Sequence, residues 1–410
     1  MPQKLDVAII GAGPCGLAAA TELARLGSHS VTVFERETEA GGVPRHCGHP
    51  PFGMREFKRI HTGPGYTRKL IRRAINSGVD IQTGVSVISL HENGCLVLSS
   101  NAGTFQVEAR RVLLCTGTRE TPRSTRLVSG VRALGIMTTG ALQSIIYLKN
   151  QRPCERPLIV GTELVSFSAL LTCRHAGIKP VAMIEKNSRI SAHQWSKLLP
   201  RILGVDLRLN TEIVEISGDY RVKSVQLRNR SGQTESVECD SVIFSGQFIP
   251  EASLCRTGHL KIDEATGGPI VDQFGRCSDP TYYAAGNVLR GVETAGWCWR
   301  EGVNIASVIS HDLKRPSNTD SHTRIKIGSD VIKYVMPSSL ALPMGALANP
   351  VTLQVRLTGR AKGTLQLKMG RQLVASRKIN SVPERRILFS LKNLPLLDAA
   401  ESLELTFEDA

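Results

Sequence analysis

The ten cysteines of this 410-residue sequence never occur in C-x-C or C-x-x-C spacing. That absence argues against a disulfide framework, a structural zinc site and an iron–sulfur cluster held by this chain alone. Long apolar runs are also absent, so no segment is expected to span a bilayer. The first apolar strand begins close to the first residue and leaves no room for a signal peptide. Together these absences predict a cytoplasmic protein.

Aromatic and acidic residues are scarce. Aromatics make up 5% of the chain, and 51 basic residues outnumber 36 acidic ones, which gives a net charge of +15. The basic residues are spread along the sequence without a recognisable nucleic-acid module, so we expect no nucleic-acid partner. An acidic substrate, an acidic partner protein or an anionic membrane face explains the charge as well, which leaves peripheral membrane association open.

The first forty residues predict a strand, a glycine turn, a helix and a second strand. Residues 7–10 are apolar and partly β-branched, as in a strand covered on both faces. They are followed at once by a complete G-x-G-x-x-G at residues 11–16, which we call the first turn. Residues 17–26 are rich in Ala and Leu and read as a helix. The second strand, residues 31–34, ends at Glu35.

Each residue of this pattern has a physical role in binding a dinucleotide. Gly11 makes the turn, Gly13 lets the backbone approach a pyrophosphate, and Gly16 lets helix and strand pack closely. The helix N-terminus then faces the phosphates, and Glu35 can accept a hydrogen bond from a ribose hydroxyl.

The pattern occurs a second time. Residues 158–160 form an apolar strand that leads into residues 161–166, which we call the second turn. A helix to Ala176 and a strand that ends at Glu185 follow. Glu185 lies 24 residues after Gly161, and Glu35 lies 24 residues after Gly11. This equal spacing predicts two related dinucleotide-binding units in one chain.

The second turn departs from the first at two positions. Glu163 and Ser166 stand where the first turn has Gly13 and Gly16. A carboxylate about 4 Å from a pyrophosphate costs roughly 1 to 4 kcal/mol, depending on screening. We therefore expect NAD(P) binding to be weakened or lost. In the alternative, Glu163 turns outward and the nucleotide shifts.

Two such units, the second inserted in the first, resemble the FAD-dependent pyridine nucleotide-disulfide oxidoreductase-like flavoproteins, which include glutathione reductase and thioredoxin reductase. Residues 111–122, 241–251 and 281–302 also resemble the family's crossing segments and its late cofactor-binding segment. The resemblance covers roughly residues 5–312 and implies an α/β fold with two Rossmann-like dinucleotide-binding domains. It places the FAD-binding domain at 1–125 and 246–313 and a degenerate NAD(P)-binding-like domain at 126–245. The residues that follow depart from the family, and their own pattern predicts a linker at 314–324 and a small C-terminal all-β domain at 325–410.

The resemblance also implies which residues hold FAD. The set comprises Gly11, Ala12, Gly13, Pro14, Cys15, Gly16, Glu35, Arg36, Gly42, Val43, Val87, Thr116, Gly117, Gly286, Asn287, Thr294 and Ala295. Asn287 replaces the family's acid, and an amide can still bond a ribitol hydroxyl. The family's pattern puts the flavin ring between the loop at 42–49 and the helix that follows Thr294.

The loop at 41–57 contains one cysteine between two histidines, and three interpretations of it stay open. His46, Cys47 and His49 could ligate a metal, but ligands so close in sequence rarely complete a tetrahedral site, so no metal is expected. Cys47 could be a single redox cysteine whose thiolate the neighbouring His and Arg stabilise. In the third interpretation the loop lines the cofactor, and His46 or His49 bonds flavin or substrate.

The redox-active cysteine pair of the named reductases is missing, so electrons need another route. The degenerate second turn resembles the two-domain subunit of hydrogen cyanide synthase and of multicomponent amine, opine and hydroxyproline dehydrogenases. This implies an FAD-dependent dehydrogenase subunit in a hetero-oligomer. A second flavoprotein subunit would oxidise a small amine, imino acid or hydroxy acid, and any iron–sulfur cluster would lie on a partner chain. The alternatives are an NAD(P)H-dependent reductase that uses Cys47 and a flavin-bound scaffold.

The C-terminal residues alternate apolar and polar side chains at period two. The segments 351–359, 363–378, 385–394 and 402–409 are separated by Gly, Pro and Asn turns. They predict a small antiparallel sheet or sandwich, which we interpret as a docking or oligomerisation module.

Overall fold

A computed structural model describes residues 2–27, 30–291, 293–315, 321–342, 351–391 and 402–410. The chain divides into two compact units. The first unit comprises Met1–Ala40, Leu70–Thr118 and Pro250–Ala410, and the second comprises Gly41–Lys69 and Arg119–Ile249. No described helix is both long and apolar enough to cross a membrane.

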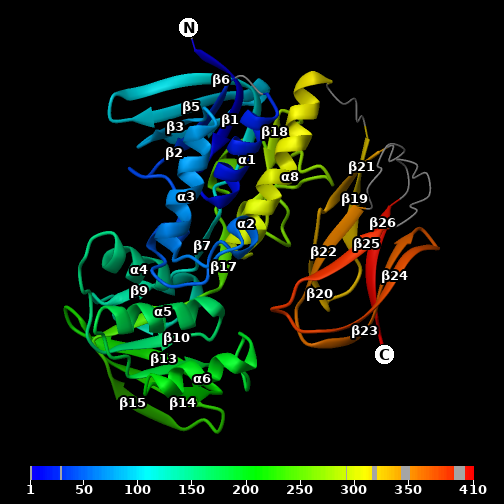
Figure 1. Ribbon diagram of the computed structural model, residues 1–410. Helices are drawn as coiled ribbons and strands as arrows, with labels where there is room; N and C mark the ends of the chain where they lie inside the picture. Colours follow the sequence, from blue (N-terminus) through cyan, green and yellow to red (C-terminus); the bar gives the residue numbers. More distant parts are fainter. Residues whose placement is uncertain (1, 28–29, 292, 316–320, 343–350, 392–401) are drawn as a thin grey trace. The chain divides into compact units, whose positions relative to one another are not determined.

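The first unit is built on a seven-stranded sheet with the order β3-β2-β1-β6-β5-β4, in which β18 pairs with β6 (Figure 1). Its strands are β1 (Gln3–Ile10), β2 (Val31–Glu35), β3 (Asp80–Thr83), β4 (Ser86–Leu90), β5 (Cys95–Ser100), β6 (Gly103–Leu114) and β18 (Tyr282–Ala284). β1 is parallel to both β2 and β6, as a dinucleotide-binding sheet requires. Its helices are α1 (Pro14–Arg25), α7 (Ser253–Thr257) and α8 (Ala295–Lys314), with the short turns η2 (Glu92–Gly94) and η5 (Gly286–Val288).

Helices α1 and α8 pack closely because small residues line their contact. A Cβ atom placed on Gly302 would lie 2.2 Å from the Cys15 carbonyl oxygen and 3.1 Å from the Ala18 side chain. This backbone approach fixes α8 against the helix that follows the first turn.

The second unit repeats the parallel sheet, with the order β12-β11-β10-β16-β9. Its strands are β9 (Ile136–Thr138), β10 (Pro157–Val160), β11 (Ala182–Glu185), β12 (Asp206–Leu209) and β16 (Ser241–Phe244). A further sheet contains β8 (Ser129–Gly130), β13 (Thr211–Gly218), β14 (Val222–Asn229) and β15 (Thr234–Glu238). The unit also contains α2 (Met54–Phe57), α4 (Thr139–Tyr147), α5 (Leu164–His175), α6 (Leu198–Ile202), η1 (Val43–His46), η3 (Arg123–Arg126) and η4 (Gln194–Lys197).

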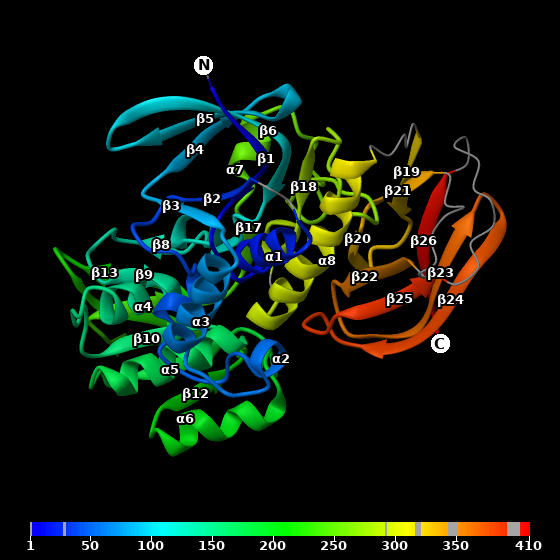
Figure 2. The same ribbon diagram turned by 45° about the horizontal axis from the view of Figure 1, so that its top comes forward.

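The parallel sheet of the second unit has a different partner on each face, because successive side chains of a strand point in opposite directions. Ile159, Met183 and Ile243 pack in one cluster with α4 and α5. Leu158 and Ile184, on the opposite face, pack in a second cluster with the antiparallel strands. Figure 2 shows α4 and α5 next to β10. The second turn, at the end of β10, is therefore held by a sheet that is covered on both faces.

Three elements lie where the chain passes between the units. The strands β7 (Thr118–Glu120) and β17 (Phe248–Pro250) pair with each other, and α3 spans Gly63–Asn76. The sequence-based domain boundaries at 125/126 and 245/246 lie a few residues from the crossings at 118/119 and 249/250. Residues 41–69 belong to the second unit, a division that the linear pattern did not indicate.

The C-terminal strands, β19 to β26, form two sheets around one core. They are β19 (Ser321–Ile327), β20 (Ile332–Met336), β21 (Ser339–Leu342), β22 (Val351–Leu357), β23 (Ala361–Met369), β24 (Gln372–Ser381), β25 (Ile387–Leu391) and β26 (Leu403–Asp409). One sheet has the order β21-β19-β26-β23-β24 and the other has the order β20-β22-β25. Apolar side chains of both sheets share a single buried cluster, as in a sandwich.

The α/β fold with two Rossmann-like sheets and a strand-rich C-terminal part is confirmed. Every period-two segment named above contains a strand, although residues 392–394 of the segment 385–394 lie outside the described residues. The predicted linker at 314–324 is only partly described, because 316–320 lie outside those residues. Residues 321–324 belong to β19, so the strands begin earlier than the sequence indicated.

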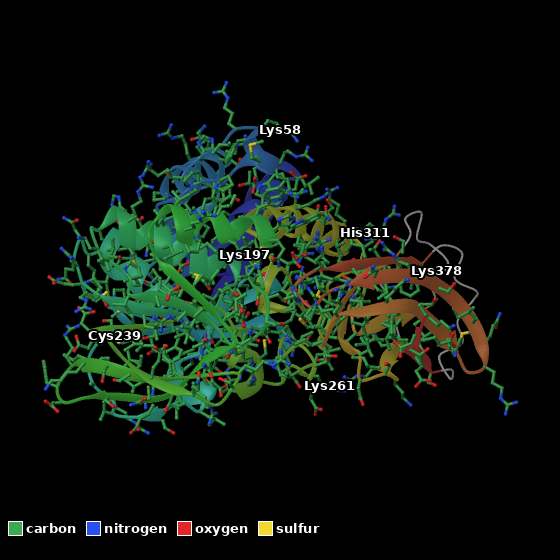
Figure 3. The ribbon with its side chains drawn as sticks, turned by 90° about the horizontal axis from the view of Figure 1, so that it is seen from below. Lys58, Lys197, Cys239, Lys261, His311 and Lys378 are labelled. Carbon is green, nitrogen blue, oxygen red and sulfur yellow. The ribbon has the colours of Figure 1, made fainter. Side chains whose placement is uncertain are left out.

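Exposed basic residues occur in every part of the chain. Lys58 and Lys197 of the second unit, Lys261 of the first and Lys378 on β24 are all exposed (Figure 3). The positive charge is thus distributed over the surface, as the spread of basic residues along the sequence suggests.

Candidate functional site

The first turn is closed to side chains at its two ends. Gly11 has a φ of +103°, and a Cβ atom there would lie 2.6 Å from the Cys115 carbonyl oxygen. A Cβ atom on Gly16 would lie 2.0 Å from the Gly11 carbonyl oxygen. Both positions therefore require glycine, the first for the turn and the second for helix packing, as the sequence pattern indicates.

The middle of the first turn is open. A Cβ atom on Gly13 would meet nothing within 4 Å, and the same holds for Gly117 after β6. Gly13 is also the N-cap of α1, and Pro14 follows it in the first helical turn. The free space at Gly13 thus lies at a helix N-terminus, where backbone N–H groups favour an anion.

Glu35 ties the first turn to the end of β2. Its side chain is buried, and its two carboxylate oxygens accept hydrogen bonds from the N–H groups of Ala12 (2.9 Å) and Glu37 (3.0 Å). Each carboxylate oxygen retains a second lone pair for a hydroxyl. Arg36, next to it, is exposed. The open space at Gly13 and the oriented carboxylate fit the pyrophosphate and ribose of an FAD.

The late segment presents a second helix N-terminus. Thr294 is the N-cap of α8, and Ala295 is its first residue. The Asn287 amide donates to the Glu293 carbonyl oxygen (3.0 Å) and accepts from the Glu293 N–H (2.7 Å). Asn287 is therefore bonded to the residue that precedes the N-cap of α8, and its amide keeps one N–H and one lone pair for a ribitol hydroxyl.

Other predicted cofactor residues have structural partners. The Thr116 hydroxyl donates to the Glu251 carbonyl oxygen (2.6 Å), and Val87, on β4, packs against the core of the first unit. The sulfur atoms of Cys15 and Cys115 lie 3.3 Å apart at the base of the first turn. The hydrogen bond with Cys115, together with burial, raises the pKa of the Cys15 thiol. Sequence spacing gave no sign of this thiol pair.

The second turn resembles the first in its backbone and differs from it in its side chains. Gly161 has a φ of +111°, and Glu163 is the N-cap of α5, as Gly13 is of α1. A Cβ atom on Gly246 would lie 2.3 Å from the Glu163 carboxyl carbon. The Gln247 N–H donates to a Glu163 carboxylate oxygen (3.0 Å). The carboxylate therefore lies against the loop that follows β16, the strand next to β10.

This position is the one a nucleotide would use. In open α/β sheets ligands bind outside the carboxyl ends of the strands where the strand order reverses, here between β10 and β16. The Glu163 carboxylate points across this crevice towards Gly246 rather than outward, and thus takes up space that the first turn leaves free.

Further side chains close the second turn. The Ser166 hydroxyl, at the third glycine position, donates to the Ser245 hydroxyl (2.8 Å). A Glu120 carboxylate oxygen accepts from the Gly246 N–H (2.9 Å), and burial raises the pKa of Glu120. Arg126 donates to the carbonyl oxygens of Ser245 and Gly246 at 3.2 and 2.8 Å. Two carboxylates therefore flank Gly246, and the nearby guanidinium is engaged by backbone oxygens.

Cys47 is buried and uncharged. Its side chain follows η1, and its sulfur lies 3.5 Å from the Val43 carbonyl oxygen and 3.5 Å from the Gln143 amide oxygen. Burial raises the pKa of the Cys47 thiol to about 12, and Glu120 contributes in the same direction. A reactive cysteine needs the opposite shift, because the thiolate is the nucleophile.

A polar chain continues from Cys47 to His49. The Gln143 amide nitrogen donates to the Ser168 hydroxyl oxygen (2.5 Å), which lies 2.7 Å from His49 Nε2. His49 Nδ1 lies 3.0 Å from the Pro50 carbonyl oxygen, so Nδ1 carries the proton in neutral His49 and the Ser168 hydroxyl donates to Nε2. Gln143 and Ser168 are 96 and 119 residues from Cys47 and His49 in sequence, and no sequence signal singled them out.

The structure does not bring His46, Cys47 and His49 together as ligands. Among the described residues no group of three or more His, Cys, Asp or Glu side chains could hold a metal ion. His46 ends η1, whereas Cys47 and His49 belong to the polar chain.

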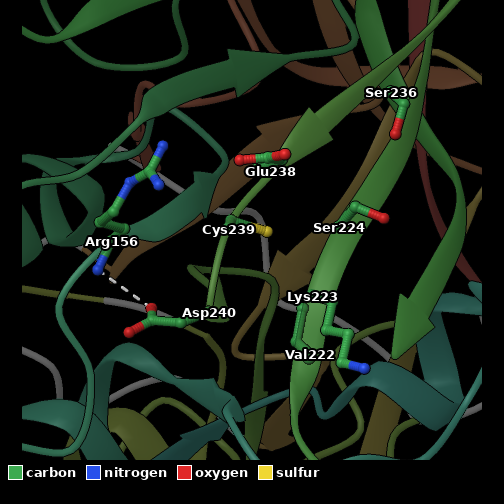
Figure 4. A pocket seen from close by; sticks show the side chains of 8 residues that line it. All are labelled: Arg156, Val222, Lys223, Ser224, Ser236, Glu238, Cys239 and Asp240. Carbon is green, nitrogen blue, oxygen red and sulfur yellow. Dashed lines mark hydrogen bonds between the residues drawn. The ribbon is translucent and has the colours of Figure 1, made fainter. Parts of the chain in front are cut away.

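A surface pocket of about 490 Å³ lies elsewhere in the second unit. It is lined by Arg156, Val222, Lys223, Ser224, Ser236, Glu238, Cys239 and Asp240 (Figure 4). Burial raises the pKa of the Cys239 thiol to about 11, and two acids balance two bases. The pocket contains none of the predicted site residues.

Comparison with known proteins gives the family. The sequence profile of the family described as pyridine nucleotide-disulphide oxidoreductase matches residues 5–302, more than half of the chain. The chain is 25% identical over 352 residues to an opine oxidase subunit of Agrobacterium tumefaciens (strain Ach5), covering 78% of this chain and 68% of the relative. It is 26% identical over 321 residues to the NAD-dependent dihydropyrimidine dehydrogenase subunit PreT of Salmonella typhimurium, covering 75% and 68%.

Solved structures agree with these relatives. The crystal structure of T. acidophilum thioredoxin reductase superposes with a TM-score of 0.64 at 25% sequence identity, and the match covers 76% of this chain and 99% of that chain. The C-terminal strands lie outside the residues that the family profile matches.

Proposed function

The chain belongs to the pyridine nucleotide-disulphide oxidoreductase family, and from this premise we propose that it is the FAD-dependent subunit of a multicomponent dehydrogenase. Members of the family are flavoproteins, so the chain is an FAD-binding oxidoreductase. The finer assignment concerns where its electrons come from and where they go.

One observation carries the proposal, the contrast between the two turns. Gly13 offers open space at the N-terminus of α1, and Gly117 after β6 is open as well, whereas the second turn holds the Glu163 carboxylate against Gly246. A phosphate would meet bare backbone at the first turn and a negative charge at the second. The contrast supports one bound dinucleotide, FAD, and argues against NAD(P) as its reductant.

The residues of the first unit have distinct roles in this proposal. Gly13 and the N-terminus of α1 would hold the pyrophosphate, Glu35 would accept from the ribose, and Asn287 would bond the ribitol. The N–H groups at the start of α8 would face the pyrimidine ring. Bound FAD supplies a two-electron acceptor. Gly42 and Val43 belong to the second unit, and their contact with FAD stays a prediction.

A partner chain would complete the electron route. The sequence contains no C-x-x-C pair that could accept electrons from the flavin. Cys47 is a buried thiol with a raised pKa, so we do not assign it as an electron acceptor. Both relatives are named as subunits, one of an opine oxidase and one of a dihydropyrimidine dehydrogenase. We infer a second flavoprotein subunit that oxidises a small amine, imino acid or hydroxy acid, and an acceptor or iron–sulfur centre outside this chain.

Anaerobic titration of the FAD-loaded chain with NADH and with NADPH tests the proposal. The visible absorbance of the flavin is expected to persist, because Glu163 occupies the second turn. Rapid bleaching by either nucleotide would overturn the proposal and favour a nucleotide-dependent reductase. A scaffold role is tested in the reconstituted complex: if a Gly13→Trp variant lost FAD and the complex kept its turnover, the flavin of this chain would carry no electrons.

A further inference from the structure

Among the described residues, the C-terminal strands make polar side-chain contacts with the rest of the first unit around Gln273 and around Glu293, and Met336 on β20 adds an apolar contact. At the first, the Gln273 amide donates to the Ala341 carbonyl oxygen (2.9 Å) and accepts from the Ala341 N–H (2.8 Å). The second polar contact is centred on Glu293, the residue before the N-cap of α8. The two polar contacts differ in what they touch, since only the second reaches the helix N-terminus of the proposed FAD site.

The Glu293 carboxylate is held by side chains of the C-terminal strands. Its side chain is 7% exposed. The Gln354 amide donates to one carboxylate oxygen (2.8 Å), and Arg356 donates to the same oxygen (3.1 Å). Arg386, just before β25, lies 3.5 Å from the other oxygen. A buried carboxylate is costly unless it is paired and hydrogen-bonded, so these three donors fix the position of Glu293.

The same contact extends into α8. The Arg386 guanidinium lies over the Trp297 ring, 3.6 Å from its centroid. The Glu293 backbone is bonded twice to the Asn287 amide, as described above. The C-terminal strands are therefore linked both to Asn287, through the Glu293 backbone, and to Trp297 in the first turn of α8.

The contact also carries an excess of positive charge. Arg356 and Arg386 both pair with Glu293, so these three side chains together carry a charge of +1. The neighbouring Arg290 is fully buried and paired with Glu301, so that pair is neutral.

We propose that Glu293, Arg356 and Arg386 are positioning residues through which the C-terminal strands set the reduction potential and the retention of FAD. They fix Glu293, and through its backbone Asn287, and place their combined charge of +1 near the proposed pyrimidine end of the flavin. Reduction of a flavin adds negative charge, so a nearby cation favours the reduced form and raises the potential. The inference rests on the proposed FAD site.

Redox titration of the FAD-loaded full chain against reference dyes tests the inference. Glu293→Gln removes a negative charge and is expected to raise the midpoint potential, whereas Arg386→Met removes a positive charge and is expected to lower it. The double variant restores the original net charge and is expected to return close to the wild-type value. Arg386→Lys keeps the positive charge and is expected to leave the midpoint potential unchanged.

Two further measurements separate charge from loss of docking. Gln273→Ala removes the two hydrogen bonds to Ala341, which lie away from Glu293, and is expected to leave the potential unchanged. Glu293→Gln is also expected to weaken FAD binding on the order of tenfold, measured by equilibrium dialysis, because the loop loses its charged anchor.

The outcomes are distinguishable. Potentials that stay flat, or that shift in the same direction for Glu293→Gln and Arg386→Met, would overturn the inference while the FAD site stands. A wild-type chain that binds no FAD would overturn the proposed function instead. If Glu293→Gln fails to fold, the comparison of Arg386→Met with Arg386→Lys still decides, because equal potentials in the two variants would contradict a charge effect.

Discussion

Replacement of Glu163 is the sharpest test of the second turn. Glu163→Gln removes the negative charge and keeps the side chain, whereas Glu163→Gly removes both and recreates the residue that stands at position 13. Glycine fits this site without strain, because Glu163 has ordinary extended dihedrals at the N-cap of α5. Glu163→Gly removes the hydrogen bond that the Gln247 N–H donates to the Glu163 carboxylate, and Glu163→Gln replaces the carboxylate by a weaker acceptor. Each change is expected to cost about 1 kcal/mol of folding stability.

The expected gain in nucleotide affinity follows from the position of the carboxylate. It lies in the crevice between β10 and β16, where a pyrophosphate would approach to about 4 Å. At that separation two like charges repel by roughly 1 kcal/mol in water and about 4 kcal/mol near a protein surface. Glu163→Gly is therefore expected to tighten NAD(P)H binding by roughly one to three powers of ten. Glu163→Gln should give the electrostatic part of that gain alone.

Quenching of nicotinamide fluorescence, or calorimetry, measures the dissociation constants. Glu235→Gln is a matched control, because it removes one exposed carboxylate from the same unit at a site away from the second turn. Glu235→Gln is expected to leave the dissociation constants of NADH and NADPH unchanged. The reasoning fails if Glu163→Gly and the wild-type chain bind NADH and NADPH equally well, since the carboxylate would then not be what excludes the nucleotide.

Three further changes have defined outcomes. Gly13→Glu places in the first turn the acid that the second turn carries, and FAD should be lost on gel filtration; retention of the yellow colour would contradict the assignment of the turn. Cys47→Ser should keep flavin reduction in the reconstituted complex, because with a pKa of about 12 only about one thiol in ten thousand is ionised at about pH 8; abolished turnover would show a redox role. Asp312→Asn should lower the free energy of unfolding by roughly 1.5–3 kcal/mol in chemical denaturation, because it removes a charged hydrogen-bond acceptor from Arg276, which keeps Asp272 as its other carboxylate partner.

The contribution of Asp312 to the free energy of unfolding is expected to depend on pH. Burial disfavours its carboxylate, but the hydrogen bonds from Arg276 and Tyr283 prevail and lower the pKa of Asp312. A carboxyl whose folded pKa is below its unfolded value of about 3.9 stabilises the protein above that value. The wild-type chain should therefore lose this contribution as the pH falls through the lowered folded pKa, and the Asp312→Asn variant should show a flatter acid limb.

Local patterns in the sequence predicted local structure well. The roles of Gly11, Gly13 and Gly16 depend on dihedral angles and close approaches within one turn and its adjacent strand, so spacing alone was enough to infer them. The period-two segments at 351–409 likewise became strands, because one face of each is buried in a shared core. In contrast, β19, β20 and β21 were not among the segments that the pattern singled out.

Contacts between distant segments could not be read from the sequence. Gln143 and Ser168 lie on α4 and α5, and only the packing of those helices brings them to Cys47 and His49. The same holds for Glu293, whose partners are 61 and 63 residues away on β22. No local spacing encodes such pairs, because they depend on how whole elements pack.

The two turns also show why a glycine pattern must be judged by what surrounds it. In the second turn Glu163 is not the only acid, because Glu120 accepts a hydrogen bond from the same Gly246 whose Cα carbon faces the Glu163 carboxylate. Burial raises the pKa of Glu120, so this second carboxyl repels an anion less than a fully ionised one would. Arg126 offsets part of this charge, because its guanidinium, which donates to the carbonyl oxygens of Ser245 and Gly246, also interacts favourably with both Glu120 and Glu163. In Glu163→Gly the remaining acid faces this cation alone, so loss of the Glu163 carboxylate is expected to account for most of the gain in nucleotide affinity. At the first turn, a Cβ atom on Gly13, or on Gly117 after β6, would meet nothing within 4 Å.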